Sequence, residues 1–109
     1  MWYIPTDLMG VPFDNNHLAI GWKKKGCVVF SFRHLSGGSL DCHFSANKEA
    51  LRHIREAIND FIEWVRTTYP ECYRIVAAIN RNSVSKIVES INFKYVGNLE
   101  GHLIYERLI

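Results

Sequence analysis

Long apolar segments are missing from this chain. No run approaches the roughly 18 to 20 apolar residues that a membrane-spanning helix needs. The first residues also lack the positive flank and the extended apolar stretch of a secretory signal. We therefore expect a protein of the cytoplasm that makes no membrane contact.

Cysteine is scarce, and its three positions are isolated from one another. Cys27, Cys42 and Cys72 form no C-x-x-C pair, which argues against both a disulfide framework and a structural zinc site. Each lies in an apolar run, so we predict buried free thiols. The five histidines show no H-E-x-x-H spacing, and the sequence therefore predicts no metal site.

An excess of one charge sign is missing too. Thirteen Lys and Arg residues oppose eleven Asp and Glu residues, which leaves a net charge of +2. The longest basic run is residues 23–25 beside Gly26, where we expect a solvated turn. This balance argues against a nucleic-acid partner, because such partners require a basic surface.

Apolar and aromatic side chains, in contrast, are plentiful, at 48% and 13% of the residues. These fractions exclude a disordered chain. A length of 109 residues supports one hydrophobic core without help from a metal or a disulfide. We therefore predict a single domain over residues 1–109.

The first half of the chain has the pattern of β-strands. Residues 1–16 predict one short extended piece followed by a loop, since proline, glycine and asparagine interrupt any period. Residues 17–22 and 27–33 are β-branched and aromatic runs joined by a short glycine-containing link, which predicts a hairpin. A glycine-rich turn at residues 36–39 then leads into a third strand at 40–46.

The second half alternates helices with strands. Apolar residues at helical spacing predict a long helix over about 47–68, and a second helix over 82–91. Residues 73–79 are almost wholly apolar, which is typical of a strand covered on both faces. Residues 93–96 and 103–107 predict two closing strands. This order indicates an α/β (α+β) fold with a mixed, mostly antiparallel sheet and two main helices.

The C-terminal third carries the most informative residues. The turn at residues 79–83 leads into a helix, then into Asn-Phe at 92–93, and the chain closes with Leu-Ile-Tyr-Glu at 103–106. In this order of elements the chain resembles the GCN5-related N-acetyltransferase (GNAT) superfamily. The resemblance implies acetyl-CoA as the cofactor, with Asn80, Asn82 and Ser83 near its arm. The alternative role of that turn is to cap the second helix.

The cofactor loop departs from the family pattern. GNAT enzymes hold the pyrophosphate with a Gln/Arg-x-x-Gly-x-Gly/Ala loop, and residues 45–50 at that place contain no glycine. Glu49 puts a carboxylate where a phosphate would lie. The alternative is an ordinary helix start that Asn47, or Ser45, caps. If the loop does bind the cofactor, the resemblance assigns this role to Ser45, Ala46, Asn47, Lys48 and Ala50.

Acyl transfer also requires a base and an acid. Asp41 and His43 share one face of the third strand, because alternate residues point the same way. They form either a proton relay or part of a half-exposed polar face. Tyr105 is a candidate acid if it faces the cofactor, or else an aromatic residue with its hydroxyl in water. The helical tyrosine of the family falls at Val88, and Cys42 faces away from His43.

A narrower resemblance covers the N-terminal half. Residues 4–8, 10–22 and 30–38 resemble small head-assembly proteins of short-tailed bacteriophages. That resemblance implies a virion-assembly role with phage or virion proteins as partners, and catalysis that is lost or was never shown. The helices that shape the acceptor site of many GNAT enzymes are missing, or are reduced to loop 6–16. A non-catalytic assembly protein is thus the first hypothesis, and a small acetyl-CoA-dependent N-acetyltransferase is the alternative.

Four aromatic residues, Trp2, Tyr3, Phe13 and Trp22, lie near the N-terminus with few charges between them. Exposed aromatic side chains are enriched at protein interfaces, so a surface for a partner or for a homo-oligomer is one interpretation. The other is a core that the first hairpin completes.

Overall fold

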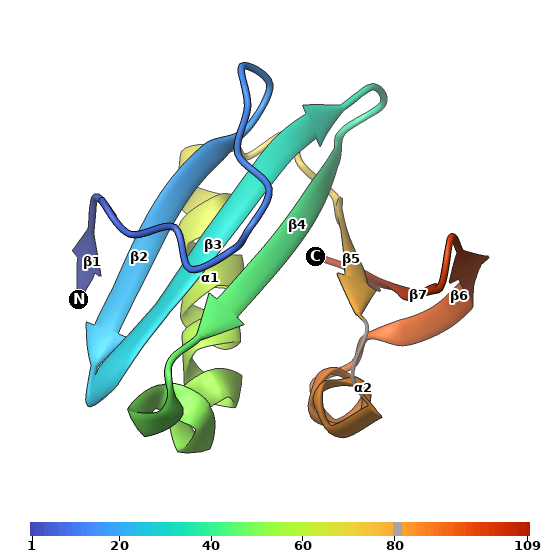
Figure 1. Cartoon of the computed structure of the whole chain (residues 1–109). Coiled ribbons are helices and arrows are strands. Elements are labelled where there is room, and N and C mark those ends of the chain that lie inside the picture. The colour runs from blue at the N-terminus through green and yellow to red at the C-terminus, as the bar shows by residue number, and fades with distance from the viewer. Residues whose placement is uncertain (80–81) are drawn as a thin grey trace.

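One seven-stranded sheet organises the computed structural model, which describes residues 1–79 and 82–109 (Figure 1). The strand order is β1-β2-β3-β4-β5-β7-β6, and β4 and β5 are the parallel pair among antiparallel neighbours. A parallel pair needs a crossover connection, which a helix supplies here. The strands are β1 Trp2–Tyr3, β2 Leu18–Lys24, β3 Gly26–Leu35, β4 Ser39–Ala46, β5 Arg74–Ile79, β6 Lys94–Leu99 and β7 His102–Leu108.

The helices pack on one face of the sheet (Figure 1). The first segment begins as a 3₁₀ helix, η1 Lys48–His53, and continues as α1 Ile54–Thr68; the second is α2 Asn82–Ser90. The predicted α+β class, with a mostly antiparallel sheet and two main helices, is confirmed. The 3₁₀ start differs from the predicted α-helix, because the Ala50 N–H bonds the carbonyl three residues earlier, at Asn47.

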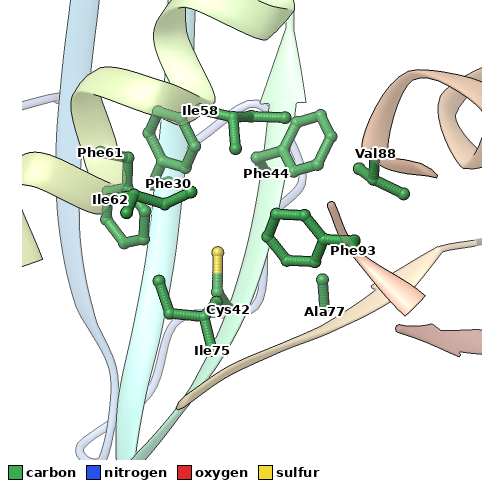
Figure 2. A pocket seen from close by; sticks show the side chains of 10 residues that line it. All are labelled: Phe30, Cys42, Phe44, Ile58, Phe61, Ile62, Ile75, Ala77, Val88 and Phe93. Atoms are coloured by element: carbon green, nitrogen blue, oxygen red, sulfur yellow. The ribbon is translucent and has the colours of Figure 1, made fainter. Parts of the chain in front are cut away.

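A single apolar core lies between the sheet and both helices. Phe30 of β3 stacks on Phe61 of α1 with ring centroids 4.4 Å apart, and Val88 of α2 is 1% exposed in the same core. A gap of about 10 Å³ remains among these side chains (Figure 2). Its lining is apolar, and a buried water needs polar partners, so the gap belongs to the packing of the core.

Strand boundaries lie within three residues of the predicted ones, and the lysine run shows the main difference. Lys23 and Lys24 continue β2, and Lys24 pairs with Gly26 across the hairpin, so the turn is at Lys25 alone. Gly26 has φ of +81°, which glycine adopts without strain and which permits so tight a turn. The Lys24 ammonium is 3.0 Å from a carboxylate oxygen of Glu56.

The burial of β5 corrects a second expectation. We predicted a strand covered on both faces, but buried Ile75 and Ala77 alternate with half-buried Val76 and Ala78. Both helices lie on one face of the sheet, so the other face of β5 stays partly exposed.

The N-terminal segment, residues 4–17, crosses the face that the helices leave open (Figure 1). It contains no helix or strand, which confirms the predicted loop. The three cysteines are free thiols, and Cys42 and Cys72 are buried as predicted. The predicted burial of Cys27 is wrong, because this residue follows the hairpin turn at the end of the sheet and is half-buried. Among the residues described, no helix is long and apolar enough to span a bilayer.

Two of the four N-terminal aromatic residues, Trp2 and Trp22, complete the core. Trp22 is 1% exposed, and the Trp2 ring lies 6.1 Å from that of Trp64. Tyr3 is half-buried. The core interpretation is therefore confirmed for Trp2 and Trp22. Tyr3 follows Trp2 in β1, so it points to the opposite face of the sheet, where its ring lies against Gly21. Phe13 is 56% exposed.

Candidate functional site

Strands β4 and β5 separate before either one ends. Their parallel pairing runs from Ser39 opposite Arg74 to Cys42 opposite Ala77, whereas β4 stays paired with β3 as far as Ala46. Among the described residues, the last part of β4 therefore has a strand on one side only. A cleft of about 610 Å³ occupies the space between the parted ends.

The cleft is large enough for a small-molecule ligand. Its wall combines the N-terminal segment, the ends of β4 and β5, the start of the long helical segment, α2 and the start of β7. The residues that line it are Met9, Gly10, Val11, Pro12, His43, Phe44, Ser45, Ala46, Leu51, Ile54, Ala78, Ile79, Val84 and His102.

The main chain at the end of β4 offers hydrogen bonds to the cleft. The Asn47 N–H donates to the Cys27 carbonyl at 3.2 Å, which extends the β3–β4 ladder by one residue pair. Bonded and non-bonded pairs alternate along antiparallel strands, so Ser45 also bonds toward β3. Phe44 and Ala46 consequently direct their N–H and C=O groups away from β3, toward the cleft.

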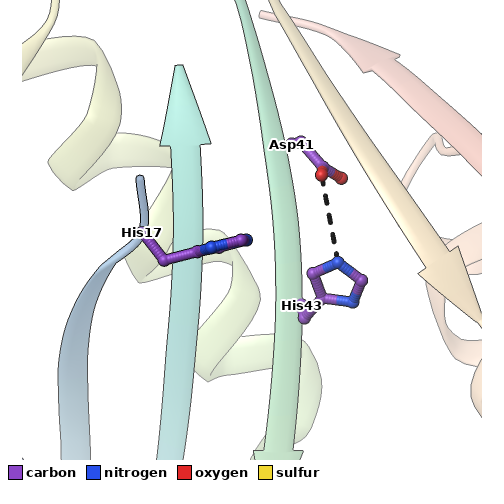
Figure 3. A group of neighbouring side chains, drawn as sticks. All are labelled: His17, Asp41 and His43. Atoms are coloured by element: carbon purple, nitrogen blue, oxygen red, sulfur yellow. Dashed lines mark ion pairs between the residues drawn. The ribbon is translucent and has the colours of Figure 1, made fainter. Parts of the chain in front are cut away.

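Asp41 and His43 lie together on the open face, as their alternation predicts (Figure 3). His43 Nε2 is 3.9 Å from Asp41 Oδ2, and Arg33 Nε donates to the same carboxylate oxygen at 3.0 Å. The side chains of His43 and Asp41 are 26% and 16% exposed. The pair is thus half-buried, and His43 lines the cleft.

Burial lowers the pKa of His43 below its ordinary value of 6.5, because desolvation disfavours the imidazolium form. The neighbouring His17, His102 and Arg33 lower this pKa further, while the Asp41 carboxylate opposes them. His43 is therefore neutral at pH 7 and can accept a proton.

His17 is a third member of this group that the sequence did not single out. Its ring lies 6.4 Å from the ring of His43, and its Nδ1 is 2.9 Å from Asp14 Oδ1. The bonds from His17 and from the Asn16 N–H hold the pKa of Asp14 below its ordinary value. The Asp-x-x-His spacing in a loop was the one local signal of this contact.

Hydrogen bonds close the start of the helical segment after β4. Asn47 Oδ1 accepts from the N–H groups of Cys27 and Ala50, at 3.1 and 3.2 Å. The Gly26 turn packs on the same atoms, since a Cβ there would lie 2.4 Å from Asn47 Oδ1 and 2.6 Å from the Ala50 nitrogen. The predicted capping role of Asn47 is confirmed.

Two of the five predicted cofactor-loop residues reach the cleft. Ser45 and Ala46 line it, whereas Asn47 is occupied as a cap. Ala50 is buried and Lys48 is exposed. A contact of these residues with a cofactor stays a prediction.

The turn after β5 is only partly described. Asn80 and the side chain of Asn82 lie outside the described residues, although Asn82 is the first residue of α2. Ser83 is exposed in the first turn, and Val84 beside it lines the cleft. The start of α2 therefore borders the cleft, and binding by these three residues stays a prediction.

Tyr105 lies away from the cleft wall. It is 3% exposed, and its hydroxyl donates to Glu89 Oε2 of α2 at 2.6 Å, which raises the pKa of Tyr105. The ring thus neither lines the cleft nor holds its hydroxyl in water, because α2 covers it. Val88 is buried in the core, so its side chain also offers no acid to the cleft.

The sequence does not identify the other cleft residues, because only the fold brings them together. Residues 9–12 lie far along the chain from His102, and none of these residues carries a motif. Apolar residues such as Leu51 and Ala78 have the same pattern as core positions. No signal in the sequence separates them from the core.

Comparisons with known proteins show which solved structures share this fold. No protein-family model and no curated protein matches the chain, but 37 chains of solved structures do. One is a chimera of the Vibrio cholerae spermidine N-acetyltransferase SpeG and hSSAT, with a TM-score of 0.68, 14% identity and coverage of 87% of this chain and 71% of that chain. Another is Tetrahymena GCN5, with a TM-score of 0.67, 15% identity and coverage of 89% and 71%.

A GNAT-family acetyltransferase from Bacillus anthracis also matches, with a TM-score of 0.61 at 14% identity, over 85% of this chain and 66% of that chain. Identities this low show the fold alone. The chain therefore has the GNAT acetyltransferase fold, and its cleft lies where two parallel strands of that fold separate. The resemblance to phage head-assembly proteins stays a prediction.

Proposed function

We propose that this protein transfers an acetyl group from acetyl-CoA to an amine in the cleft between β4 and β5. The observation that carries the proposal is the separation of these parallel strands. It directs the peptide groups of Phe44 and Ala46 into a cleft that His43 also lines. The acetyltransferase names of the structural neighbours support the same reading.

The cleft suits one part of acetyl-CoA better than another. The pantetheine arm carries two amides, and the free edge of a strand recognises such groups through main-chain hydrogen bonds. Phe44 and Ala46 would hold this arm. The diphosphate fits less well, because Asn47 and the Gly26 turn occupy the helix start. In the loop of residues 45–50, exposed Lys48 is the side chain that could offer the diphosphate a positive charge.

The amine nitrogen would attack the carbonyl carbon of the bound thioester, a C–N bond would form as the C–S bond breaks, and CoA would leave as a thiolate that takes a proton from water. His43 would take the proton of the incoming amine, for which its neutral form at pH 7 is required. The 3.9 Å between His43 Nε2 and Asp41 Oδ2 exceeds a direct hydrogen bond. Asp41 therefore acts through its charge, which stabilises the imidazolium once the proton has moved.

Calorimetric titration with acetyl-CoA tests the binding step. We expect micromolar binding that Ala46→Trp abolishes, because the indole fills the cleft. Ser36→Trp, in the exposed turn between β3 and β4, is the matched control and should bind as the parent does. An absence of heat at millimolar acetyl-CoA, with a parent protein shown to be folded by circular dichroism, contradicts the proposal.

Release of the CoA thiol in the presence of a panel of amines tests the chemistry. His43→Gln should lower kcat/KM by roughly 10²- to 10⁴-fold, the contribution of a general base. Acetyl-CoA binding by this variant should stay close to that of the parent. A variant that retains full activity would exclude His43 as the base.

A second proposal is a non-catalytic assembly role, with phage or virion proteins or a second copy of the chain as partners. The closed helix start favours it, since Asn47 Oδ1 already accepts from the Ala50 N–H, one of the helix-start groups that a pyrophosphate would need. In that case acetyl-CoA gives no heat. Analytical ultracentrifugation of the purified protein should then show a concentration-dependent oligomer, and a monomer at all concentrations would argue against self-assembly.

A further inference from the structure

We propose that His17, Asp41 and His43 bind a divalent metal ion of the zinc class, a site beyond the proposed acetyl transfer. One ligand atom of each residue lies within 4.8 Å of the other two (Figure 3). His17 ends the N-terminal segment, whereas Asp41 and His43 are alternate residues of β4. The fold thus collects three potential ligands from two distant parts of the sequence.

The distances require only side-chain adjustment. Zinc binds imidazole nitrogen and carboxylate oxygen at about 2.0 to 2.2 Å, which places two ligand atoms of a tetrahedral set roughly 3.3 Å apart. Atoms now within 4.8 Å of one another reach this arrangement by small rotations about the side-chain bonds. Three protein ligands leave a fourth position for water.

His17 is already oriented as a ligand. Its Nδ1 bonds Asp14 Oδ1 at 2.9 Å. Because a carboxylate only accepts, the neutral ring carries its proton on Nδ1 and has its lone pair on Nε2. The Asn16 N–H donates to the same oxygen at 2.8 Å and fixes the carboxylate. A carboxylate behind the imidazole is the usual outer contact of a metal-bound histidine.

Asp41 is held in a comparable way. Arg33 Nε donates to its Oδ2 at 3.0 Å, which orients the carboxylate and leaves further lone pairs for a metal. The Arg33 side chain is 46% exposed, so water screens its repulsion of a cation.

A buried hydroxyl beside the cluster points independently to a missing partner. Ser31 Oγ is fully buried and has no hydrogen-bond partner among the residues described. Ser31 lies directly opposite His43 in the β3–β4 ladder, and such cross-strand side chains are neighbours. A water on the fourth position of the metal would supply the partner.

The donor set selects the class of metal. Two imidazole nitrogens and one carboxylate oxygen suit zinc and neighbouring transition metals, whereas magnesium and calcium prefer oxygen alone. A metal on His43 Nε2 would place the ring proton on Nδ1, so the ring could no longer accept one. The metal-bound protein would then be inactive in the proposed acetyl transfer.

Titration of chelator-treated protein with Zn²⁺ by calorimetry, and with Co²⁺ by absorption, tests the site. We expect one equivalent of either metal and cobalt bands without thiolate charge transfer. His17→Gln and Asp41→Asn should each weaken zinc binding at least tenfold. Asp14→Asn keeps all three ligands and should weaken it by roughly 10- to 100-fold, as loss of an outer contact does.

His34→Gln, at an exposed histidine of β3, is the matched control and should bind as the parent does. Circular dichroism checks that each variant is folded, and Asp14→Asn carries the test if a ligand variant unfolds. Equal zinc affinity in the parent and the folded variants, or no binding by the parent, overturns the site. The titrations contain no acetyl-CoA, so this result is independent of the acetyl-transfer test.

Discussion

The charges around His43 decide how readily it takes a proton. Burial, His17, His102 and Arg33 all lower its pKa, and Asp41 alone raises it among the groups that act on it. Since its folded pKa lies below 6.5, the neutral ring stabilises the fold above that pH. This contribution is lost as the pH falls through 6.5 toward the folded pKa.

Asp41→Asn should therefore lower the pKa of His43 further, because it removes the charge that favours the imidazolium. An NMR titration of the His43 ring in metal-free protein measures the change. The acid limb of any acetyl-transfer activity should move to lower pH in parallel. Asp7→Asn, at an exposed position of the N-terminal segment, serves as the control, and an upward shift in the Asp41 variant would show that another group dominates.

Asn47 is the second residue whose replacement has a defined outcome. Asn47→Ala removes the acceptor of the Cys27 and Ala50 N–H groups and should lower the free energy of unfolding by about 1 to 2 kcal/mol. Urea denaturation measures this loss. Asn59→Ala, on the exposed side of α1, should change stability by less than about 0.5 kcal/mol. Equal effects of the two replacements would remove the capping role.

Single residues were predictable where a local rule applies. Residues two apart on a strand share a side, so Asp41 and His43 could be paired from the sequence. The cap at Asn47 follows from a side-chain preference of helix starts. His17 and Tyr105 could not be placed, because the first depends on how the N-terminal segment crosses the sheet and the second on its bond to Glu89 of α2.

Among the elements, α2 shows most clearly how this chain differs from the GNAT enzymes whose fold it has. Val88 stands where the helical tyrosine of GNAT enzymes would fall, and it packs beside an apolar gap of about 10 Å³ (Figure 2). That gap is far too small for a phenol ring. The side chain of Val88 is therefore part of the apolar core.

Val88→Tyr should destabilise the protein by about 1 to 3 kcal/mol or more through overpacking, and it should not raise acetyl-transfer activity. Thermal unfolding and CoA release measure the two effects. Lys86→Tyr places the same ring on the exposed side of α2 and should leave stability nearly unchanged. A Val88→Tyr protein that is as stable as the parent and more active would show that α2 can turn this position toward the cleft.

Helices and strands with a clear hydrophobic period were predicted well, whereas the burial of each element was predicted less well. Helical spacing located α1 and α2, and β-branched runs located the strands. The apolar run of β5 indicated burial on both faces, but the same composition suits a strand that only one helical layer covers. The sequence of neither strand indicates where β4 separates from β5, since this point depends on how far the pairing between the two strands extends.

At the scale of the whole molecule, a bound ligand should protect a discontinuous set of segments. Hydrogen exchange with and without acetyl-CoA should show slower exchange at residues 44–46 and 9–11, which line the cleft from two distant parts of the sequence. Residues 36–38, in a turn outside the lining, should exchange equally in both conditions. Protection confined to other segments would place the ligand elsewhere on the protein.

The N-terminal segment contributes to both proposed ligand sites, through residues 9–12 in the cleft wall and His17 in the histidine cluster. A metal ion would link His17 of this segment to β4, and a ligand in the cleft would contact residues 9–12 of the same segment. His43 also belongs to both proposed sites, since it lines the cleft and is a ligand of the proposed metal site, so the two occupants should be thermodynamically coupled. Whatever factor the metal imposes on the affinity for acetyl-CoA, acetyl-CoA must impose on the affinity for the metal. Through this segment of irregular chain, occupation of one proposed site would change the ligand affinity of the other.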